Sequence, residues 1–232
     1  MAASAADAPV GRSVRYRDLL LRLLSAAILG PLLLAAIWLG FPWIDLVAAL
    51  AAPLMVSEWV RLTRNRPFWR ILAILYALAA VVALLWLRHQ PTLGRETSIW
   101  IVLCIWATDT GAYVVGRAAG GAKLAPRISP SKTWSGLIGG MAWAAVASAA
   151  TGYAFGLGET ISLAMIGAGL AVVGQIGDLV ESAAKRSAGV KDSGTLIPGH
   201  GGLLDRVDGF IAVLVAVALV RLAVGGGWPW TA

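Results

Sequence analysis

Seven long apolar stretches constrain this chain more than any other feature of its sequence. They cover residues 19–40, 41–60, 69–87, 98–116, 134–155, 160–181 and 209–226. About 20 consecutive apolar residues cross a bilayer as an α-helix. The hydrocarbon core offers no hydrogen-bond partners, so a spanning backbone must satisfy its own N–H and C=O groups, as a helix does. We therefore predict an all-α polytopic membrane helix bundle with about seven transmembrane helices, within a range of six to nine.

The composition excludes the usual classes of water-soluble protein. Apolar residues make up 59% of the chain and charged residues 13%, compared with roughly 25% charged in an average globular domain. The single cysteine, Cys104, excludes an internal disulfide and a cysteine-rich metal site. The net charge of +7 favours lipid headgroups or an anionic substrate as partners. We expect no nucleic acid partner, because the cations lie in short loops between apolar stretches.

The basic residues predict the orientation of the chain. Sixteen of the 19 lysines and arginines precede the main part of the first stretch or follow the second, fourth and sixth stretches. Arg88, Arg95 and Arg221 fall on or near the other side. The positive-inside rule then places the N-terminus in the cytoplasm and the C-terminus outside. The first stretch is too long for a signal peptide and lacks a small-residue cleavage motif, so we expect a retained anchor.

The polar residues divide the chain into two parts. Residues 1–97 carry three stretches, and residues 98–232 carry four stretches with two basic cytoplasmic loops, which we expect to form the catalytic membrane region. In the first part Glu58 stands three residues before Arg61, and we interpret the two as an interfacial ion pair.

A polar stripe ends the stretch at residues 160–181. Gly174, Asp178, Glu181 and Lys185 recur at helical spacing on one face, with Ser182 beside them. A carboxylate at membrane depth costs at least about 2.5 kcal/mol, so this stripe should face a cavity. A Glu181–Lys185 pair is a common helix pairing, and it leaves Asp178 unpaired.

The loop that follows, residues 182–208, is the densest polar stretch in the chain. Its cations suit phosphate oxygens; they are Lys185, Arg186, Lys191 and Arg206. Its glycines allow backbone N–H groups to approach a ligand; they include Gly199, Gly201 and Gly202. Asp205 and Asp208 are one turn apart if the last helix begins early, and with Asp178 they offer oxygen ligands suited to Mg²⁺ or Mn²⁺. His200 is equally compatible with a base, a phosphate donor or a packing group.

A second basic loop follows the stretch at residues 98–116. Ser131, Lys132 and Thr133 supply hydroxyls and a cation near the start of the next helix, whose N-terminus favours an anion. Taken alone, helix capping by Ser131 or Thr133 is the simpler explanation. Asp109, a carboxylate within an apolar stretch, favours a functional interpretation.

These motifs resemble the phosphatidate cytidylyltransferase family, or CDP-diacylglycerol synthases. The family pattern is Ser-x-apolar-Lys-Arg, four residues, Lys-Asp, and then Pro-x-His-Gly-Gly-x-x-Asp-Arg-x-Asp. This chain matches it at Ser182, Lys185, Arg186, Lys191, Asp192, Pro198, His200, Gly201, Gly202, Asp205, Arg206 and Asp208. An upstream Gly-Asp-x-x-Glu-Ser motif is present at residues 177–182. At positions 131 and 135 the family usually has Lys and Glu, whereas this chain has Ser at both.

The resemblance implies transfer of a cytidylyl group from CTP to phosphatidate with Mg²⁺, and it leaves a second cation open. It also implies a homodimer in the cell membrane with its active site on the cytoplasmic side. Asp178 and Asp205 would hold the metal with Asp208 nearby, and Lys185, Arg186, Lys191 and Arg206 would hold the phosphates. Further substrate contacts are expected from Ser131, Lys132, Thr133, Ser182, Asp192, His200, Gly201 and Gly202. Asp109 and Glu181 are weaker candidates.

Two other functions remain open at this point. A CTP-dependent kinase of a polyprenol-type lipid would need a base for a hydroxyl group, which His200 or an aspartate could supply. An ion-coupled transporter would explain Asp109 and Asp178 as intramembrane carboxylates. It would not explain why cations, glycines and acids concentrate in one loop.

Overall fold

The computed structural model describes residues 12–156, 158–196, 201–225 and 228–229. Its helices are α1 (Arg12–Leu39), α2 (Trp43–Leu62), α3 (Pro67–Arg88), α4 (Gly94–Ala119), α5 (Trp134–Phe155), α6 (Thr160–Ser187) and α7 (Leu204–Val224). Six of these, α2 to α7, are long and apolar enough to cross a membrane, and among the side chains that the structure describes α1 contributes the shorter apolar segment Ala27–Leu39. The prediction of an all-α polytopic membrane bundle is confirmed.

The helices begin and end at residues that suit their positions. Pro67 opens α3, where its missing N–H has no intrahelical partner to lose. Thr133 caps α5 by accepting a hydrogen bond from the Gly136 N–H at 3.0 Å. Gly156 ends α5 in the left-handed conformation that glycine adopts without strain.

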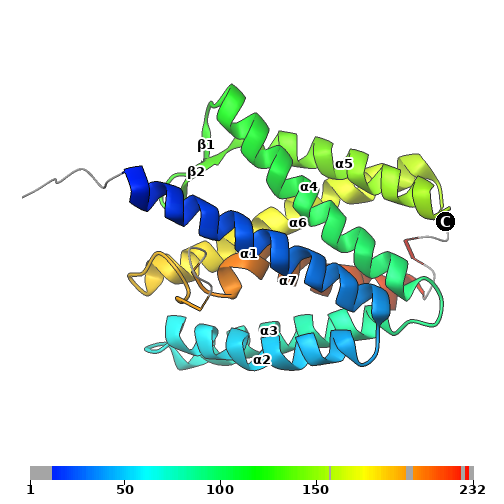
Figure 1. The fold of residues 1–232 in the computed structure, drawn as a ribbon, viewed down its shortest axis with the longest axis horizontal. Coiled ribbons are helices and arrows are strands. Elements are labelled where there is room, and N and C mark those ends of the chain that lie inside the picture. Colours follow the sequence, from blue (N-terminus) through cyan, green and yellow to red (C-terminus); the bar gives the residue numbers. More distant parts are fainter. Residues whose placement is uncertain (1–11, 157, 197–200, 226–227, 230–232) are drawn as a thin grey trace, which may run out of the picture.

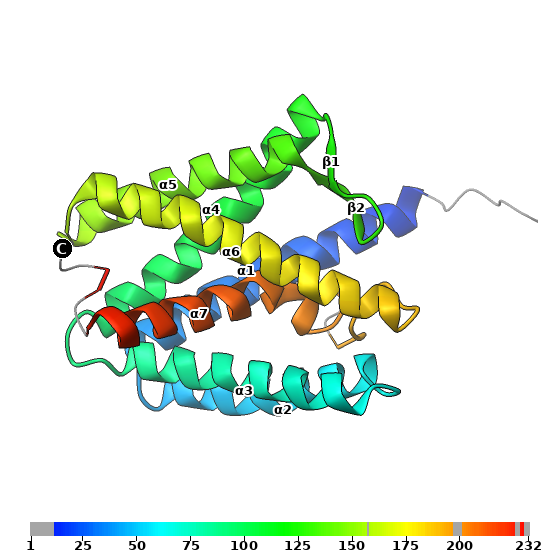
Figure 2. The same cartoon turned by 180° about the vertical axis from the view of Figure 1, so that it is seen from behind.

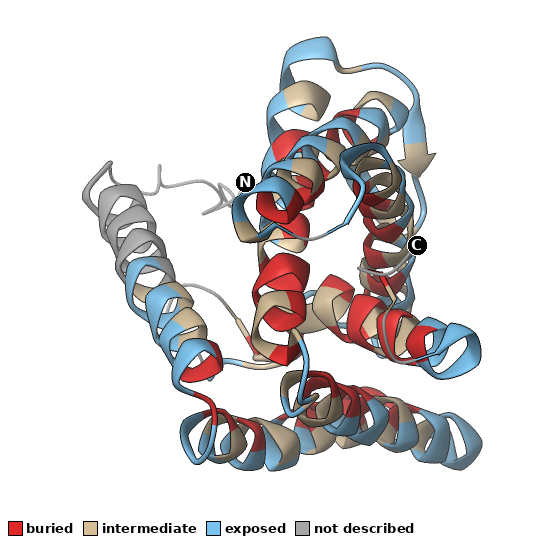
Figure 3. Ribbon diagram, turned by 90° about the vertical axis from the view of Figure 1, so that its right-hand side faces the viewer, coloured by how far each residue is buried: buried red, intermediate tan, exposed pale blue. Residues whose placement is uncertain are grey.

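Two groups of helices lie on either side of α7 (Figures 1 and 2). α4, α5 and α6 pack together on one side, and the hairpin of α2 and α3 lies on the other. α1 lies at the edge of the bundle, where it packs against α2 and α4. Burial is concentrated on the faces that the helices turn toward one another, whereas the outward faces are exposed (Figure 3).

Small residues allow α4, α5 and α6 to pack closely. A Cβ atom on Gly139 would overlap the Val115 side chain and lie 2.9 Å from the Gly111 carbonyl oxygen. A Cβ atom on Gly167 would lie 2.5 Å from the Ser148 Cβ. Without a hydrophobic driving force between helices in lipid, such close van der Waals packing contributes strongly to their association.

The two ends of the bundle differ in the segments they carry. The start of α1, the turn between α2 and α3, and the connection between α6 and α7 lie at one end (Figure 1). The turns that follow α1, α3 and α5 lie at the other end with the last turn of α7. This alternation agrees with the segregation of basic residues, because the loops rich in lysine and arginine share one end.

The structure differs from the predicted elements in two places. α7 begins at Leu204, five residues before the apolar stretch that starts at residue 209. Asp205 and Asp208 therefore lie on its first turns, which is the condition under which we expected them to be one turn apart. The fourth connection contains an antiparallel pair of short strands, β1 (Lys123–Ala125) and β2 (Ser129–Thr133), which the apolar pattern did not predict. β1 has three residues, and β2 reads Ser-Pro-Ser-Lys-Thr, so neither shows the alternation of apolar and polar residues that marks a strand.

Candidate active site

Three carboxylates meet where α6 and α7 approach each other. Oxygen atoms of Asp178, Glu181 and Asp208 lie within 4.8 Å of one another. The helices can come this close because Gly177 faces α7, where a Cβ atom would lie 2.8 Å from the Asp208 carbonyl oxygen and 2.5 Å from the Ala212 Cβ. Gly177, the residue before Asp178, thus brings the acids of two helices together.

This cluster has the chemistry of a divalent cation site. Glu181 is 2% exposed, and its Oε1 atom has no hydrogen-bond partner among the described residues. Its Oε2 atom lies 2.7 Å from the Lys185 Nζ. Three carboxylates this close repel one another, and a cation between them would relieve that repulsion. A carboxylate oxygen without a hydrogen-bond partner is also a suitable ligand for a hard cation. The residues present therefore fit a cation such as Mg²⁺.

The β1–β2 hairpin lies against the same end of α6. Lys132, on β2, forms an ion pair with Asp178, whose Oδ1 also accepts a hydrogen bond from the Ser182 hydroxyl at 3.2 Å. Arg186 donates from its Nε to the Ile128 carbonyl oxygen at 3.3 Å. Asp178, which the spacing left without a partner, therefore finds one on a different element. Ser131 is exposed on β2, and helix capping is confirmed for Thr133.

Lys185 joins the carboxylate cluster to the loop that precedes α7. Its Nζ lies 2.7 Å from the Glu181 Oε2 and 2.6 Å from the Asp205 Oδ1. Asp205 also accepts hydrogen bonds from the Ser193 N–H at 2.9 Å, the Ser193 hydroxyl at 3.0 Å and the Gly202 N–H at 2.8 Å. Asp205 was expected to share a metal with Asp178. The structure instead places it outside the cluster, with its oxygen atoms engaged in shaping the loop.

Glu58 holds the same loop from α2, a contact that the sequence analysis missed. Its carboxylate is 1% exposed. It accepts hydrogen bonds from the Ser193 hydroxyl at 2.8 Å and from the N–H groups of Leu203 and Leu204 at 2.9 and 2.8 Å. The expected pair with Arg61 exists only at 3.9 Å. A negative charge at the N-terminus of α7 is favourable, so Glu58 caps this helix from a distant part of the chain. The sequence signal that could have indicated this role is the position of Glu58, an acid inside an apolar stretch.

Two glycines of the loop are required by this packing. Gly201 has a φ of +86°, and a Cβ atom there would lie 2.6 Å from the Asp205 Oδ2. A Cβ atom on Gly202 would overlap the Ser193 hydroxyl and lie 2.6 Å from the Glu58 Oε2. Both were predicted to let a ligand approach the backbone. The contacts observed among the described residues are with the chain's own carboxylates.

The remaining predicted residues surround the cluster. Arg186, Lys191, Asp192 and Arg206 are exposed, so their charges are accessible at this end of the bundle. Asp109, on α4, borders a cavity of about 20 Å³ together with Asp178 and Asp208, and it lies within electrostatic range of Lys132 and Arg206. His200 lies outside the described residues.

The site therefore combines a carboxylate cluster, of which Glu181 is the buried member, with accessible cations. The acids of α6 and α7 can hold a cation, and the exposed arginines and lysine can bind anionic oxygens beside it. Such an arrangement suits reactions in which two phosphate-bearing molecules must approach each other, because the cations offset their mutual repulsion.

Comparisons with known proteins agree with this chemistry. A sequence profile of the cytidylyltransferase family matches residues 63–224. The phosphatidate cytidylyltransferase of Brucella suis biovar 1 is 45% identical over 187 residues, covering 77% of this chain and 64% of its own length. The corresponding protein of Pseudomonas aeruginosa is 40% identical over 203 residues, covering 85% and 71%. That of Rickettsia bellii is 36% identical over 203 residues, covering 84% and 87%. The chain spans 64% of the length of the Brucella relative.

Proposed function

The chain belongs to the cytidylyltransferase family, and we propose that it transfers a cytidylyl group from CTP to phosphatidate, giving CDP-diacylglycerol and pyrophosphate. The observation that carries this proposal is the cluster of Asp178, Glu181 and Asp208 beside three exposed cations, which are Arg186, Lys191 and Arg206. The cluster lies within the residues that match the family profile. The proteins named phosphatidate cytidylyltransferase that resemble this chain support the choice of substrates.

The reaction needs no dedicated base. A phosphate oxygen of phosphatidate is ionised at neutral pH and attacks the α-phosphorus of CTP. A new P–O bond forms, the bond from the α-phosphorus to the oxygen that bridges to the β-phosphorus breaks, and pyrophosphate leaves with that electron pair. The difficulty is the repulsion between two anions, and positioned cations reduce it. Arg186, Lys191 and Arg206 are exposed where they can bind the triphosphate and the lipid phosphate.

The other polar residues position this machinery. Lys132 and Lys185 neutralise Asp178 and Glu181 and hold the β-hairpin and the α6–α7 loop against α6. Ser131, Thr133, Ser182, Asp192, His200, Gly201 and Gly202 remain proposed substrate contacts. Mg²⁺ is the proposed cofactor, and Asp178, Glu181 and Asp208 are the residues that would hold it. Bound there, it would neutralise charge on the phosphates. This ligand set replaces Asp205 with Glu181.

The location follows from the same residues. CTP is a cytosolic molecule and the phosphatidate headgroup lies at the membrane interface, so we place the basic end of the bundle and the N-terminus in the cytoplasm. The protein is a multi-pass membrane protein, and the cell membrane is its proposed location. We also propose that the protein forms a homodimer and that its catalytic membrane region begins after residue 97.

The test is to incubate purified protein with phosphatidate, Mg²⁺ and CTP labelled at the α-phosphorus. Label should appear in the lipid, with one pyrophosphate released for each CDP-diacylglycerol formed. Chelation of divalent cations should stop the reaction. Label that stays in CDP, while an added polyprenol becomes phosphorylated, would instead identify a lipid kinase. Solute uptake into proteoliposomes without CTP would identify a transporter.

A further inference from the structure

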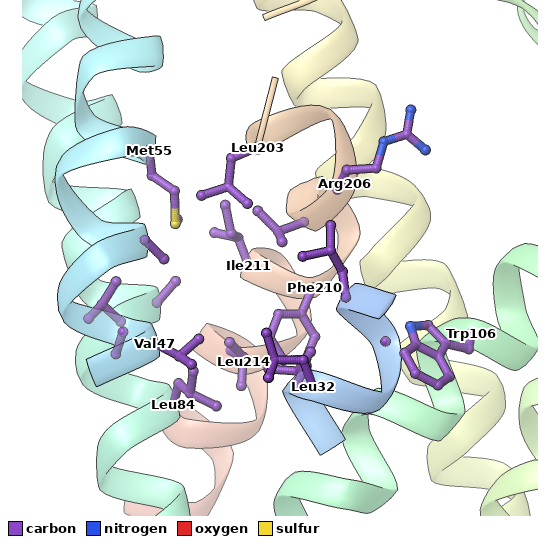
Figure 4. A pocket seen from close by; sticks show the side chains of 18 of the residues that line it. Leu32, Val47, Met55, Leu84, Trp106, Leu203, Arg206, Phe210, Ile211 and Leu214 are labelled. Carbon is purple, nitrogen blue, oxygen red and sulfur yellow. The ribbon is translucent and has the colours of Figure 1, made fainter. Parts of the chain in front are cut away.

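A large apolar cavity lies between α1, α2, α3, α4 and α7 (Figure 4). Its volume is about 640 Å³, which is within the range of about 300–1,000 Å³ typical of small-molecule sites. Most of the side chains that line it are aliphatic or aromatic, among them Leu32, Val47, Met55, Leu84, Phe210 and Leu214. A cavity of this size and lining is not needed to hold the metal or the triphosphate.

The cavity has the depth of one bilayer leaflet. Along α7 its lining runs from Leu203 to Leu214, which corresponds to about 16 Å at the helical rise of about 1.5 Å per residue. The hydrocarbon core of a bilayer is about 30 Å thick, so one leaflet fills about half of that. The end at Leu203 lies at the basic end of the bundle, and the end at Leu214 lies inside the membrane region (Figure 4).

The polar or charged residues among those that line the cavity are Ser25, Asp109, Thr110 and Arg206, and Asp109 connects it to the site. Asp109 borders it and also borders the small cavity that contains Asp178 and Asp208. α7 forms the partition between the two, with Val207 and Phe210 on the apolar side and Asp208 and Gly209 on the acidic side. Arg206 lines the mouth of the apolar cavity, and its guanidinium group points away from the apolar lining (Figure 4).

We propose that this cavity receives one acyl chain of phosphatidate and that its depth along α2 and α7 limits the length of that chain. The inference rests on the proposed function, because it assigns a subsite to that substrate. The charge distribution selects the occupant. A molecule with an apolar tail and an anionic head matches an apolar cavity whose mouth carries an arginine next to a cation site. A tail seated here leaves its phosphate at the boundary between the two cavities, next to Asp109 and the carboxylate cluster.

The test narrows the cavity at mid-depth. Ala51 lines the cavity one helical turn from Met55, away from the mouth, and Leu50 beside it is 70% exposed on the outer face of α2. Ala51→Phe is expected to lower kcat/KM for dioleoyl phosphatidate about tenfold or more, the scale on which apolar pockets discriminate size. The same variant should leave dihexanoyl phosphatidate and the KM for CTP within about twofold of wild type. Leu50→Phe, the matched control, should leave both lipids unchanged.

A second variant, Val47→Ala, tests the inference independently in case Ala51→Phe fails to fold. Val47 lies at the deep end of the cavity (Figure 4), and Val47→Ala should shift the preferred acyl length upward. Equal losses for short and long lipids in Ala51→Phe, together with an unchanged chain-length profile in Val47→Ala, would overturn the inference.

Binding separates this inference from the proposed function. Dioleoyl phosphatidate should raise the thermal unfolding temperature of wild type and Leu50→Phe but not of Ala51→Phe, whether or not CDP-diacylglycerol forms. If that pattern holds without product formation, the lipid subsite stands and the proposed reaction fails. Equal stabilisation of all three proteins by the lipid, with product formed, would retain the reaction and reject the subsite.

Discussion

At the scale of single residues, buried charges define this site, and each is held by a specific partner. Glu58 receives two backbone N–H groups and a hydroxyl, and Asp205 receives Lys185 and the Ser193 and Gly202 N–H groups. These carboxylates are occupied and shape the loop. Glu181 keeps one oxygen without a hydrogen-bond partner among the described residues. This free oxygen separates Glu181 from the acids that hold the loop and makes it the cluster member most available to a cation.

Replacing Asp208 should stop turnover without unfolding the protein. Asp208→Asn keeps the size of the side chain and removes the negative charge of one of the three proposed metal ligands. We expect the rate to fall by about 100-fold or more, which corresponds to about 2.7 kcal/mol of transition-state stabilisation. The Mg²⁺ concentration needed for half-maximal activity should also rise. Glu159→Gln, exposed at the opposite end of the bundle, is the control. Normal Mg²⁺ dependence in Asp208→Asn would remove Asp208 from the ligand set.

Glu58 should affect stability far more than its neighbour Arg61. Glu58→Gln preserves the shape but weakens three hydrogen bonds to a buried carboxylate, and an unsatisfied buried donor costs about 1–3 kcal/mol. Arg61→Gln removes an ion pair whose arginine side chain is 60% exposed, which is worth about 1 kcal/mol or less. Thermal unfolding in detergent measures both. Similar losses in the two variants would mean that the ion pair, and not the capping of α7, is the important contact.

At the scale of elements, close glycine contacts decide how α4, α5 and α6 pack, and this packing positions Lys132 and Asp178 relative to each other. Thr133 caps α5 directly after β2, so the hairpin is attached to a helix whose place is set by its contact with α4. α6 packs against α5 and α7, and its end carries Asp178 to the hairpin. A small shift between these helices would separate the acid from the lysine.

Adding one methyl group at the α4–α5 contact should therefore be harmful. A Cβ atom on Gly139 would overlap Val115, so Gly139→Ala is expected to destabilise the protein by about 1–3 kcal/mol, as overpacking does. Gly169→Ala is the matched control, because a Cβ atom at that helical position would meet nothing within 4 Å. It should be neutral or stabilising, since alanine loses less backbone freedom than glycine. If the two variants unfolded at the same temperature, close α4–α5 contact would not contribute measurably to stability.

At the scale of the whole molecule, the two ends of the bundle carry different chemistry. The connections rich in lysine and arginine share the end where the carboxylate cluster and the mouth of the apolar cavity lie. The basic end of the bundle can thus bind a water-soluble triphosphate, while the apolar cavity extends from that end into one leaflet of the membrane. The substrates of the proposed reaction differ in the same way, one being soluble and the other anchored in lipid.

Thiol labelling can establish which end faces the cytoplasm. The native Cys104 is 1% exposed, so it should not react, and single cysteines can be introduced at exposed positions. In sealed right-side-out vesicles, a membrane-impermeant reagent should label Glu159→Cys and leave Lys191→Cys unlabelled. Permeabilised vesicles should label both, which controls for reactivity. The reverse pattern in sealed vesicles would place the carboxylate cluster outside the cytoplasm and contradict the proposed access to CTP.

Much of this architecture could be predicted from local sequence patterns. Apolar stretches of spanning length predicted the bundle, because lipid forces a backbone to satisfy its hydrogen bonds within each helix. Helical spacing placed Asp178, Glu181 and Lys185 on one face, and the Glu181–Lys185 pair is observed at 2.7 Å. These inferences succeed because each depends only on residues within a single helix.

Only the tertiary structure decided which acids meet and which are already engaged. Asp205 and Asp208 belong to one helix and have similar sequence surroundings, yet Lys185 and the loop engage Asp205, and α6 meets Asp208. The role of Glu58 depends on a loop that lies 135 residues or more away in sequence, and the apolar cavity exists only between packed helices. Local patterns specify each helix and its faces. The contacts between helices depend on how side chains from distant segments fit together, and no single segment encodes that fit.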